Sequence, residues 1–292
     1  MSAFTEIKSY LRAGDGFKRL LIINFSLFIL IQIAHVIWRI TDQSELSRFH
    51  PDVYLAASSS FSEMLKRPWS LITHMFAHED VGHFLFNMIA LYTTGKLFRH
   101  FLGPSKLVVN YVLGGLSGYF LFFLFYNLFP AFDETSFILG ASAAVMSIII
   151  TVGVLRPDYS IRLFGVFEMK LIWLCGILVL VDLISLRKGF NSGGHIGHLG
   201  GALFGFIYAT QYKKGKNMAS WLERLFYKWK GLFSSKSKKS YNTGRPKTDE
   251  QFNSEKLARQ KRVDQILDKI GRAGYDSLSK EEKEFLFKYS QK

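Results

Sequence analysis

Residues 137–155 read FILGASAAVMSIIITVGVL, an uncharged apolar run that carries a Gly-Ala-Ser-Ala step near its start. Two other apolar runs also contain polar groups: His83 and Asn87 lie in one, and His198 lies in the other. Polar side chains are costly inside a bilayer, and they mark functional sites there. A buried serine and histidine with further hydrogen-bond donors are the parts of a nucleophilic active site.

The sequence predicts an all-α, polytopic membrane protein. Its 292 residues are 49% hydrophobic and 16% aromatic, and they gather in long apolar blocks separated by short polar turns. Blocks of this length suit helices that cross a bilayer core. The first block is too long for the core of a signal peptide and no small-residue cleavage site follows it, so we expect it to be retained. The six predicted spans are residues 19–39, 83–102, 106–129, 137–155, 170–186 and 195–212.

Four regions are predicted along the chain. Residues 1–18 form an amphipathic cytoplasmic lead-in, and residues 19–212 form the six-helix membrane domain. Residues 213–253 are a basic linker that we expect to be flexible. Residues 254–292 form a C-terminal cytoplasmic helical hairpin, in which Ser279-Lys-Glu-Glu282 has the form of a capping box. The hairpin carries no catalytic constellation, and its partner is unknown.

The distribution of basic residues predicts the orientation. Lys and Arg gather on the side of a membrane that is not translocated. They precede the first span and fill the tail after Tyr212, so both termini are predicted to be cytoplasmic. Arg187 and Lys188 fall on the outer side in this topology and count against it. The basic ends and the lack of a cleavable presequence favour a multi-pass protein of the bacterial inner membrane.

The net charge of +14 at pH 7 comes mainly from the tail beyond Lys213. A basic tail beside a membrane predicts attraction to the headgroups of anionic lipids. We expect no nucleic-acid partner, because no recognisable reading module is present. The single Cys175 excludes an intrachain disulfide framework and a cysteine-rich metal site.

Under this topology the three polar segments lie at one level in the outer half of the membrane. Small residues surround Ser142 and His198 and let their helices approach closely. A neutral His198 then accepts the hydroxyl proton of Ser142 and returns it to the leaving amine. Asp182 is predicted to lie in the inner-to-middle part of a different helix, so the sequence predicts a Ser-His dyad and no triad.

An acyl transfer also needs donors directed at the developing oxyanion. The candidates are the Asn87 amide, the His83 ring and the backbone N–H of Ser142. Gly140 lets the backbone pass close to a substrate.

The ordered motifs of the chain resemble the rhomboid family of intramembrane serine proteases. The run Arg67-Pro68-Trp69 is followed by Thr73-His74-Met75-Phe76-Ala77-His78 and by His83-Phe84-Leu85-Phe86-Asn87-Met88, then by Gly140-Ala141-Ser142 and by His198-Leu199-Gly200-Gly201 with Gly205. The resemblance covers roughly residues 20–212.

This resemblance implies specific roles. Ser142 is the expected nucleophile, His198 the general base, and His83 and Asn87 line the oxyanion hole. His74, His78 and Gly140 are expected to support the substrate or hold water. The implied substrates are transmembrane segments of other membrane proteins, and no cofactor is implied.

The chain departs from the family pattern at two positions. Ala143 replaces the second glycine of Gly-x-Ser-Gly, which adds one methyl group. Met146 stands where relatives often carry an aromatic residue against the base, and methionine can fill that space. His195 competes with His198 as the base, and the spacing to Gly201 and Gly205 favours His198.

Two other interpretations stay open at this point. A non-catalytic relative would use the same scaffold to bind membrane helices in quality control or trafficking. A metal-dependent enzyme would use His74, His78, His83 and His195 as ligands, but few carboxylates lie nearby, so we expect no metal.

Overall fold

The computed structural model describes residues 16–41, 53–132, 135–163, 166–187, 189, 191–225 and 249–290. The chain divides into two compact units, residues 1–231 and 232–292. Residues 1–15 of the predicted lead-in and residues 226–248 of the predicted linker lie outside the described residues.

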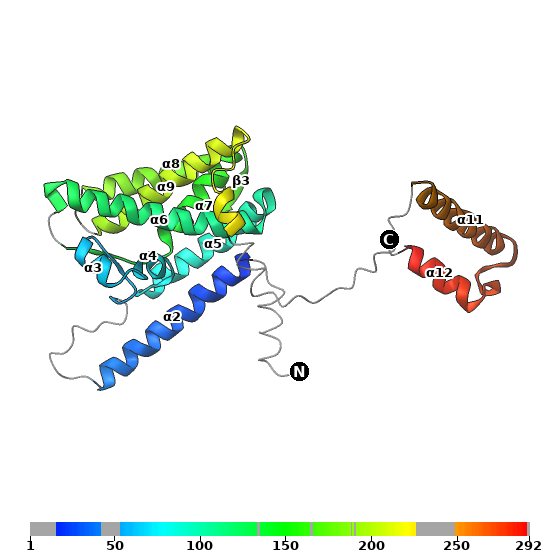
Figure 1. Cartoon of the computed structure of the whole chain (residues 1–292), viewed down its shortest axis with the longest axis horizontal. Helices are drawn as coiled ribbons and strands as arrows, with labels where there is room; N and C mark the ends of the chain where they lie inside the picture. The colour runs from blue at the N-terminus through cyan, green and yellow to red at the C-terminus, as the bar shows by residue number, and fades with distance from the viewer. Residues whose placement is uncertain are drawn as a thin grey trace. The chain divides into compact units, whose positions relative to one another are not determined.

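Six helices of the first unit overlap the six predicted spans (Figure 1). By length and composition, two of them are apolar enough to cross a membrane, α2 and α6, whereas α7 and α8 are apolar but shorter. The number of membrane spans therefore stays a prediction. The bounds are α2 Gly16–Thr41, α5 Val81–Leu102, α6 Pro104–Leu128, α7 Ser142–Leu155, α8 Leu171–Leu186 and α9 Ser192–Lys213.

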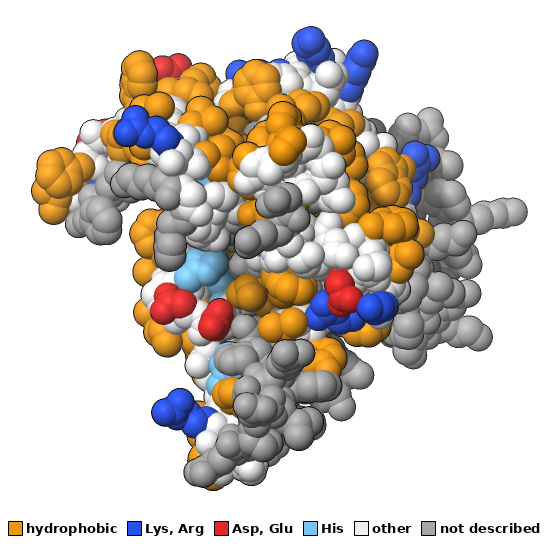
Figure 2. Space-filling model, turned by 90° about the vertical axis from the view of Figure 1, so that its left-hand side faces the viewer, with side chains coloured by type: hydrophobic (Ala, Val, Ile, Leu, Met, Phe, Trp, Pro, Cys, Tyr) orange, Lys and Arg blue, Asp and Glu red, His pale blue; other side chains and the backbone are white. Residues whose placement is uncertain are grey.

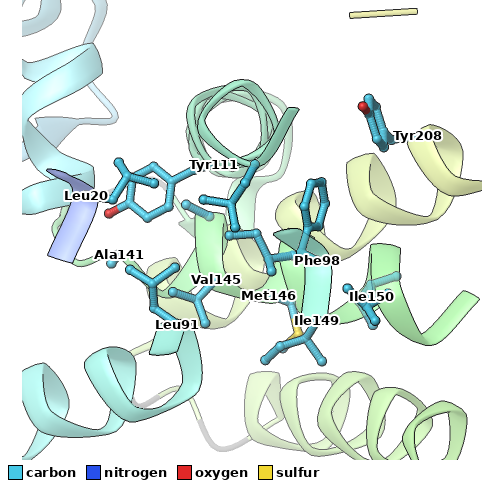
Figure 3. Packing of buried hydrophobic residues seen from close by; sticks show 14 of the residues in the cluster. Leu20, Leu91, Phe98, Tyr111, Ala141, Val145, Met146, Ile149, Ile150 and Tyr208 are labelled. Atoms are coloured by element: carbon cyan, nitrogen blue, oxygen red, sulfur yellow. The ribbon is translucent and has the colours of Figure 1, made fainter. Parts of the chain in front are cut away.

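Helix α7 forms the centre of the first unit. Its apolar residues from Ala143 to Val152 are buried, and they pack with residues of α5 and α6 such as Leu91, Phe98 and Tyr111 (Figure 3). Helices α6 and α9 both contact α7 and also contact each other. A helix that is apolar on all sides fits this central position.

Glycines allow the close approach of these three helices. A Cβ added at Gly201 of α9 would lie 2.0 Å from the carbonyl oxygen of Ala143, and one added at Gly205 would lie 2.5 Å from the carbonyl oxygen of Ser147. On α6, a Cβ at Gly118 would meet the Ala143 side chain at 2.5 Å. The predicted small-residue contact between α7 and α9 is confirmed, and it is as close as two backbones allow.

The predicted start of the fourth span at residue 137 was wrong. Phe137 and Ile138 form a short strand, β2 (Phe137–Ile138), which pairs antiparallel with β1 (Ala57–Ser58). Gly140 follows with φ of +122°, a conformation outside the helical region, so α7 begins only at Ser142. The all-α prediction is therefore correct for the main elements but missed this pairing.

A second two-stranded sheet connects α7 to α8. Strands β3 (Ser160–Leu163) and β4 (Phe167–Lys170) pair antiparallel. The predicted polar turn is thus a β-hairpin.

The segment between α2 and α5 holds short helices that side chains tie together. These are α3 (Phe61–Lys66), α4 (Ser70–Thr73) and the 3₁₀ helix η1 (His74–Phe76). Arg67 donates to the Val53 carbonyl at 2.6 Å, and Trp69 Nε1 donates to the Tyr54 carbonyl at 3.0 Å. The Arg67-Pro68-Trp69 motif therefore fixes the described part of the loop before α3.

Large apolar side chains lie exposed along the first unit, and they cover much of the face in Figure 2. On α2, Phe25 is 58% exposed and Leu30 is 61% exposed. Apolar surface of this extent is unusual for a protein in water and fits contact with lipid.

The second unit contains α11 (Asp249–Ala273), the 3₁₀ helix η3 (Tyr275–Ser277) and α12 (Lys280–Ser290). Ile266 and Leu278 are buried between these elements. The predicted capping box is confirmed: Ser279 N–H donates to Glu282 Oε2 at 2.7 Å, and Glu282 N–H donates to Ser279 Oγ at 3.2 Å. Gly274, with φ of +77°, follows the last residue of α11, whereas Gly271 lies inside that helix.

Candidate functional site

Ser142 is the first residue of α7, and its position follows from the turn that precedes it. The three residues Leu139, Gly140 and Ala141 connect β2 to the helix, and Gly140 supplies the positive φ that this turn needs. The first backbone N–H groups of a helix have no partner within the helix and carry partial positive charge. The N–H of Ser142 is therefore suited to an anionic oxygen.

His83 lies directly over this turn. A Cβ added at Gly140 would be 2.6 Å from His83 Cε1, so only glycine leaves room for the ring. The position of His83 in the first turn of α5 is set by Asp80, whose carboxylate accepts the His83 N–H at 2.7 Å as the helix N-cap. Asp80 was not predicted to belong to the site, although an Asp directly before the start of a helix is a capping signal.

Asn87 lies one turn after His83 and is buried. Its Nδ2 donates to the His83 carbonyl at 3.0 Å. An amide nitrogen carries two hydrogens, so one remains available for another acceptor.

His74 and His78 accept hydrogen bonds from the backbone of the turn before Ser142. The His74 carbonyl accepts the Gly140 N–H at 2.8 Å, and His78 Nε2 accepts the Ala141 N–H at 3.2 Å. Since Nε2 of His78 is an acceptor, Nδ1 carries the proton in the neutral ring, and among the described residues this buried Nδ1 has no partner.

His198 lies in the second turn of α9, one turn before the glycine that touches α7. The contact between Gly201 and the Ala143 carbonyl puts the His198 turn beside the start of α7. His198 is also an electrostatic neighbour of His83. Within the described part of the chain no hydrogen bond joins Ser142 Oγ to His198, which is common in sites without bound substrate.

The structure corrects the prediction for Asp182. This residue is 4% exposed, and a single carboxylate oxygen, Oδ1, contacts His198 Nδ1 at 2.8 Å and His195 Nδ1 at 2.7 Å. Asp182 was predicted to lie at another depth and outside the site, and that prediction was wrong.

Asp182 and His198 meet because a short connection joins the two antiparallel helices α8 and α9. Asp182 lies four residues before the end of α8 at Leu186, and His198 lies six residues after the start of α9 at Ser192. Residues at similar distances from one turn of a helical hairpin lie at similar depth. Counting residues from the turn would have found this pair.

The quartet of metal ligands considered from the sequence does not come together. His74 Nδ1 contacts the Ser70 carbonyl at 2.8 Å, and His195 faces Asp182. In the described residues, the group of three with metal-ligand spacing is Asp182, His195 and His198, whose ligand atoms lie within 4.8 Å of one another. Its contacts of 2.7 and 2.8 Å have the length of charge-assisted hydrogen bonds.

Comparison with known proteins gives two matches to families. Residues 65–214 match the Rhomboid domain, and residues 247–292 match a family of unknown function, DUF6576.

Similar curated proteins include RHOMBOID-like protein 12, mitochondrial, of Arabidopsis thaliana, 28% identical over 62% of this chain and 55% of that protein. The presenilin-associated rhomboid-like protein, mitochondrial, of Homo sapiens is 27% identical over 52% of this chain and 40% of its own length. Rhomboid protease GluP of Bacillus subtilis is 24% identical over 49% of this chain and 25% of its own length. The chain thus spans about half or less of the length of these relatives.

Proposed function

Because the chain belongs to the rhomboid family of membrane proteins, we propose that it is an intramembrane serine endopeptidase. Its substrates are transmembrane segments of other membrane proteins, cleaved near the outer membrane boundary. The observation that carries this proposal is the backbone contact between Gly201 and Ala143, because it brings the turn of His198 beside Ser142. The name of the similar Bacillus protein, Rhomboid protease GluP, agrees with this activity.

In the proposed reaction, Ser142 Oγ attacks the carbonyl carbon of the scissile peptide bond. His198 Nε2 takes the hydroxyl proton and delivers it to the leaving amine, so that an acyl ester on Ser142 remains. A water molecule, deprotonated by the same imidazole, then hydrolyses the ester and frees the serine.

The negative charge on the carbonyl oxygen is stabilised by three groups around the Gly140 turn. The backbone N–H of Ser142 lies at the positive end of α7, the His83 ring packs over Gly140, and Asn87 has a second amide hydrogen available. One such donor typically contributes roughly 10²- to 10³-fold in rate.

The substrate helix has to unwind before it is cleaved. Its backbone carbonyls are hydrogen-bonded within the helix and shielded from a nucleophile. The buried Nδ1–H of His78 is a donor that can hold a water molecule.

The proposed location is a cell membrane, with both termini cytoplasmic and the bacterial inner membrane as the preferred site. The basic segment from 213 to 253 contacts anionic lipids, and residues 254–292 bind a partner that is still to be identified.

The test is cleavage of a generic transmembrane substrate by the purified full chain in detergent. We expect Ser142→Ala and His198→Ala each to abolish cleavage, and a fluorophosphonate to label the unmodified chain but not Ser142→Ala. Cleavage by Ser142→Ala at the unmodified rate would reject the nucleophile.

A second candidate is a non-catalytic binder of membrane helices. The observation in its favour is that no hydrogen bond joins Ser142 to His198 in the described residues. A binder would capture the substrate equally well with and without Ser142, and neither form would cleave it or react with the fluorophosphonate.

A further inference from the structure

Asp182 is a buried carboxylate whose partners come only from α9 among the described ion pairs. Its side chain is 6% exposed, and the ion pairs recorded for it are those with His195 and His198. A buried carboxylate is stable only when hydrogen-bond donors compensate its charge. Two imidazole N–H groups on Oδ1 provide this compensation.

These contacts determine which nitrogen of His198 carries the proton. An ionised carboxylate oxygen only accepts hydrogen bonds, so the His198 nitrogen that faces it, Nδ1, has to be the N–H. In the neutral ring, Nε2 then has a free lone pair. This is the tautomer that the proposed base needs, because Nε2 must accept the proton of Ser142.

The same contacts fix the orientation of the ring. His195 lies almost perpendicular to His198, with an interplanar angle of 86° and ring centroids 5.9 Å apart. Asp182 holds Nδ1 of His198, and the His195 ring packs edge-on against the His198 ring. These two contacts restrict the rotamers of His198. A base that is fixed in advance loses less entropy when the reaction begins.

We propose that Asp182 is a positioning residue that holds His198 with Nδ1–H on the carboxylate and with Nε2 free for the Ser142 hydroxyl, an inference that rests on the proposed protease function. His195 is the second donor that completes the compensation of the Asp182 charge. Asp182 itself contacts neither the substrate nor the reacting atoms.

The kinetic test compares Asp182→Ala and Asp182→Asn with the unmodified full chain in detergent. We expect Asp182→Ala to lower kcat by roughly 10²- to 10⁴-fold, up to the loss seen when the base of a triad loses its orienting carboxylate. KM should change less than about twofold, because uniform substrate binding is untouched. Asp182→Asn keeps the shape of the side chain, but its amide can turn an N–H toward Nδ1 and favour the wrong tautomer, so its kcat should also fall, by up to about 10⁴-fold.

A matched control is Cys175→Ala. Cys175 is also buried on α8, but it packs against α7 at Gly153, two turns away from Asp182. We expect its kcat to stay within about twofold of the unmodified chain. If Cys175→Ala loses as much kcat as Asp182→Ala, or if Asp182→Ala retains full kcat while Ser142→Ala is inactive, the positioning role is rejected and the protease proposal is not.

A second measurement does not depend on activity. In full-length Ser142→Ala protein with ¹⁵N-labelled histidine, we expect the His198 signals of an Nδ1–H tautomer, and we expect them to change to the Nε2–H tautomer in Ser142→Ala/Asp182→Ala. An unchanged tautomer would overturn the inference even for a protein that cleaves nothing.

A chelator tests the remaining explanation, which is that Asp182, His195 and His198 bind a metal ion. Because Asp182, His195 and His198 have metal-ligand spacing, cleavage is also measured with EDTA and after added Zn²⁺. We expect no loss with EDTA. A loss that Zn²⁺ reverses would mean that Nδ1 binds a metal rather than donating to Asp182, and the inference would fail.

Discussion

Gly140 determines how closely His83 approaches the serine. Its φ of +122° is strained for any residue with a Cβ, and the position of that Cβ is occupied by the His83 ring at 2.6 Å. Both effects act on one residue, so the site depends on the absence of a side chain here. Gly140 was predicted to let the backbone pass close to a substrate, and in the structure the His83 ring also occupies the space that a side chain here would need.

Gly140→Ala is therefore expected to reduce both stability and cleavage. The strained backbone alone costs on the order of 1–3 kcal/mol of unfolding free energy, and displacement of His83 should lower kcat at least tenfold if His83 stabilises the oxyanion. Thermal unfolding in detergent and the cleavage rate measure the two effects.

Gly176→Ala is the matched control, because no atom lies within 4 Å of its added Cβ and it lies inside helix α8. Alanine in a helix interior should stabilise by about 0.5–1 kcal/mol and leave cleavage unchanged. A Gly140→Ala protein as stable and active as this control would contradict the role of the glycine.

At the scale of helices, the close contact between α7 and α9 brings the turns of Ser142 and His198 side by side. Gly201→Ala adds a methyl group where the Ala143 carbonyl oxygen would be 2.0 Å away, so the helices have to separate. We expect a loss of about 1–3 kcal/mol of unfolding free energy. Cleavage should fall at least tenfold, because a shift of about 1 Å between catalytic groups can cost 10²-fold in rate.

Gly197→Ala on the same helix provides the comparison. Its added Cβ meets no atom closer than 3.9 Å, so we expect stability and cleavage close to those of the unmodified chain. Equal effects of the two substitutions would show that helix propensity, and not contact with α7, explains the result.

The helices show what the sequence can and cannot predict. The long apolar blocks located all six helices, and the small residues around Ser142 and His198 predicted the contact between α7 and α9. The start of α7 was missed because Phe137 and Ile138 read equally well as helix or strand, and only their pairing with Ala57 and Ser58 decides it.

Asp182 was missed for a different reason. Its partners lie 13 and 16 residues away across a helical turn, so no local pattern marks them. A charge in an apolar helix does indicate a partner, because it is costly without one. The sequence contained that signal, but the wrong predicted depth of Asp182 separated it from His198.

At the scale of the whole molecule, the two units rely on different forces. The first exposes apolar side chains to its surroundings, whereas the second is a polar hairpin with Ile266 and Leu278 buried. The hairpin gains order from Glu282, which accepts Ser279 N–H at 2.7 Å and Lys269 Nζ at 3.0 Å. The hydrogen bond from the Ser279 backbone N–H holds the pKa of Glu282 below its usual value, and the hydrogen bond from Lys269 adds a smaller effect in the same direction.

A depressed pKa in the folded state means that Glu282 stabilises the hairpin above the pKa of the unfolded chain, and that this contribution is lost as the pH falls through the folded pKa. In hydrogen exchange of the full chain at pH 7, Glu282→Gln should therefore exchange faster than the unmodified protein over residues 249–290. The difference should disappear in acid, where both side chains are neutral. Glu281→Gln, in the same helical turn but outside the capping box, should have a smaller effect. Equal effects at both positions would assign the stabilisation to the dipole of α12 alone.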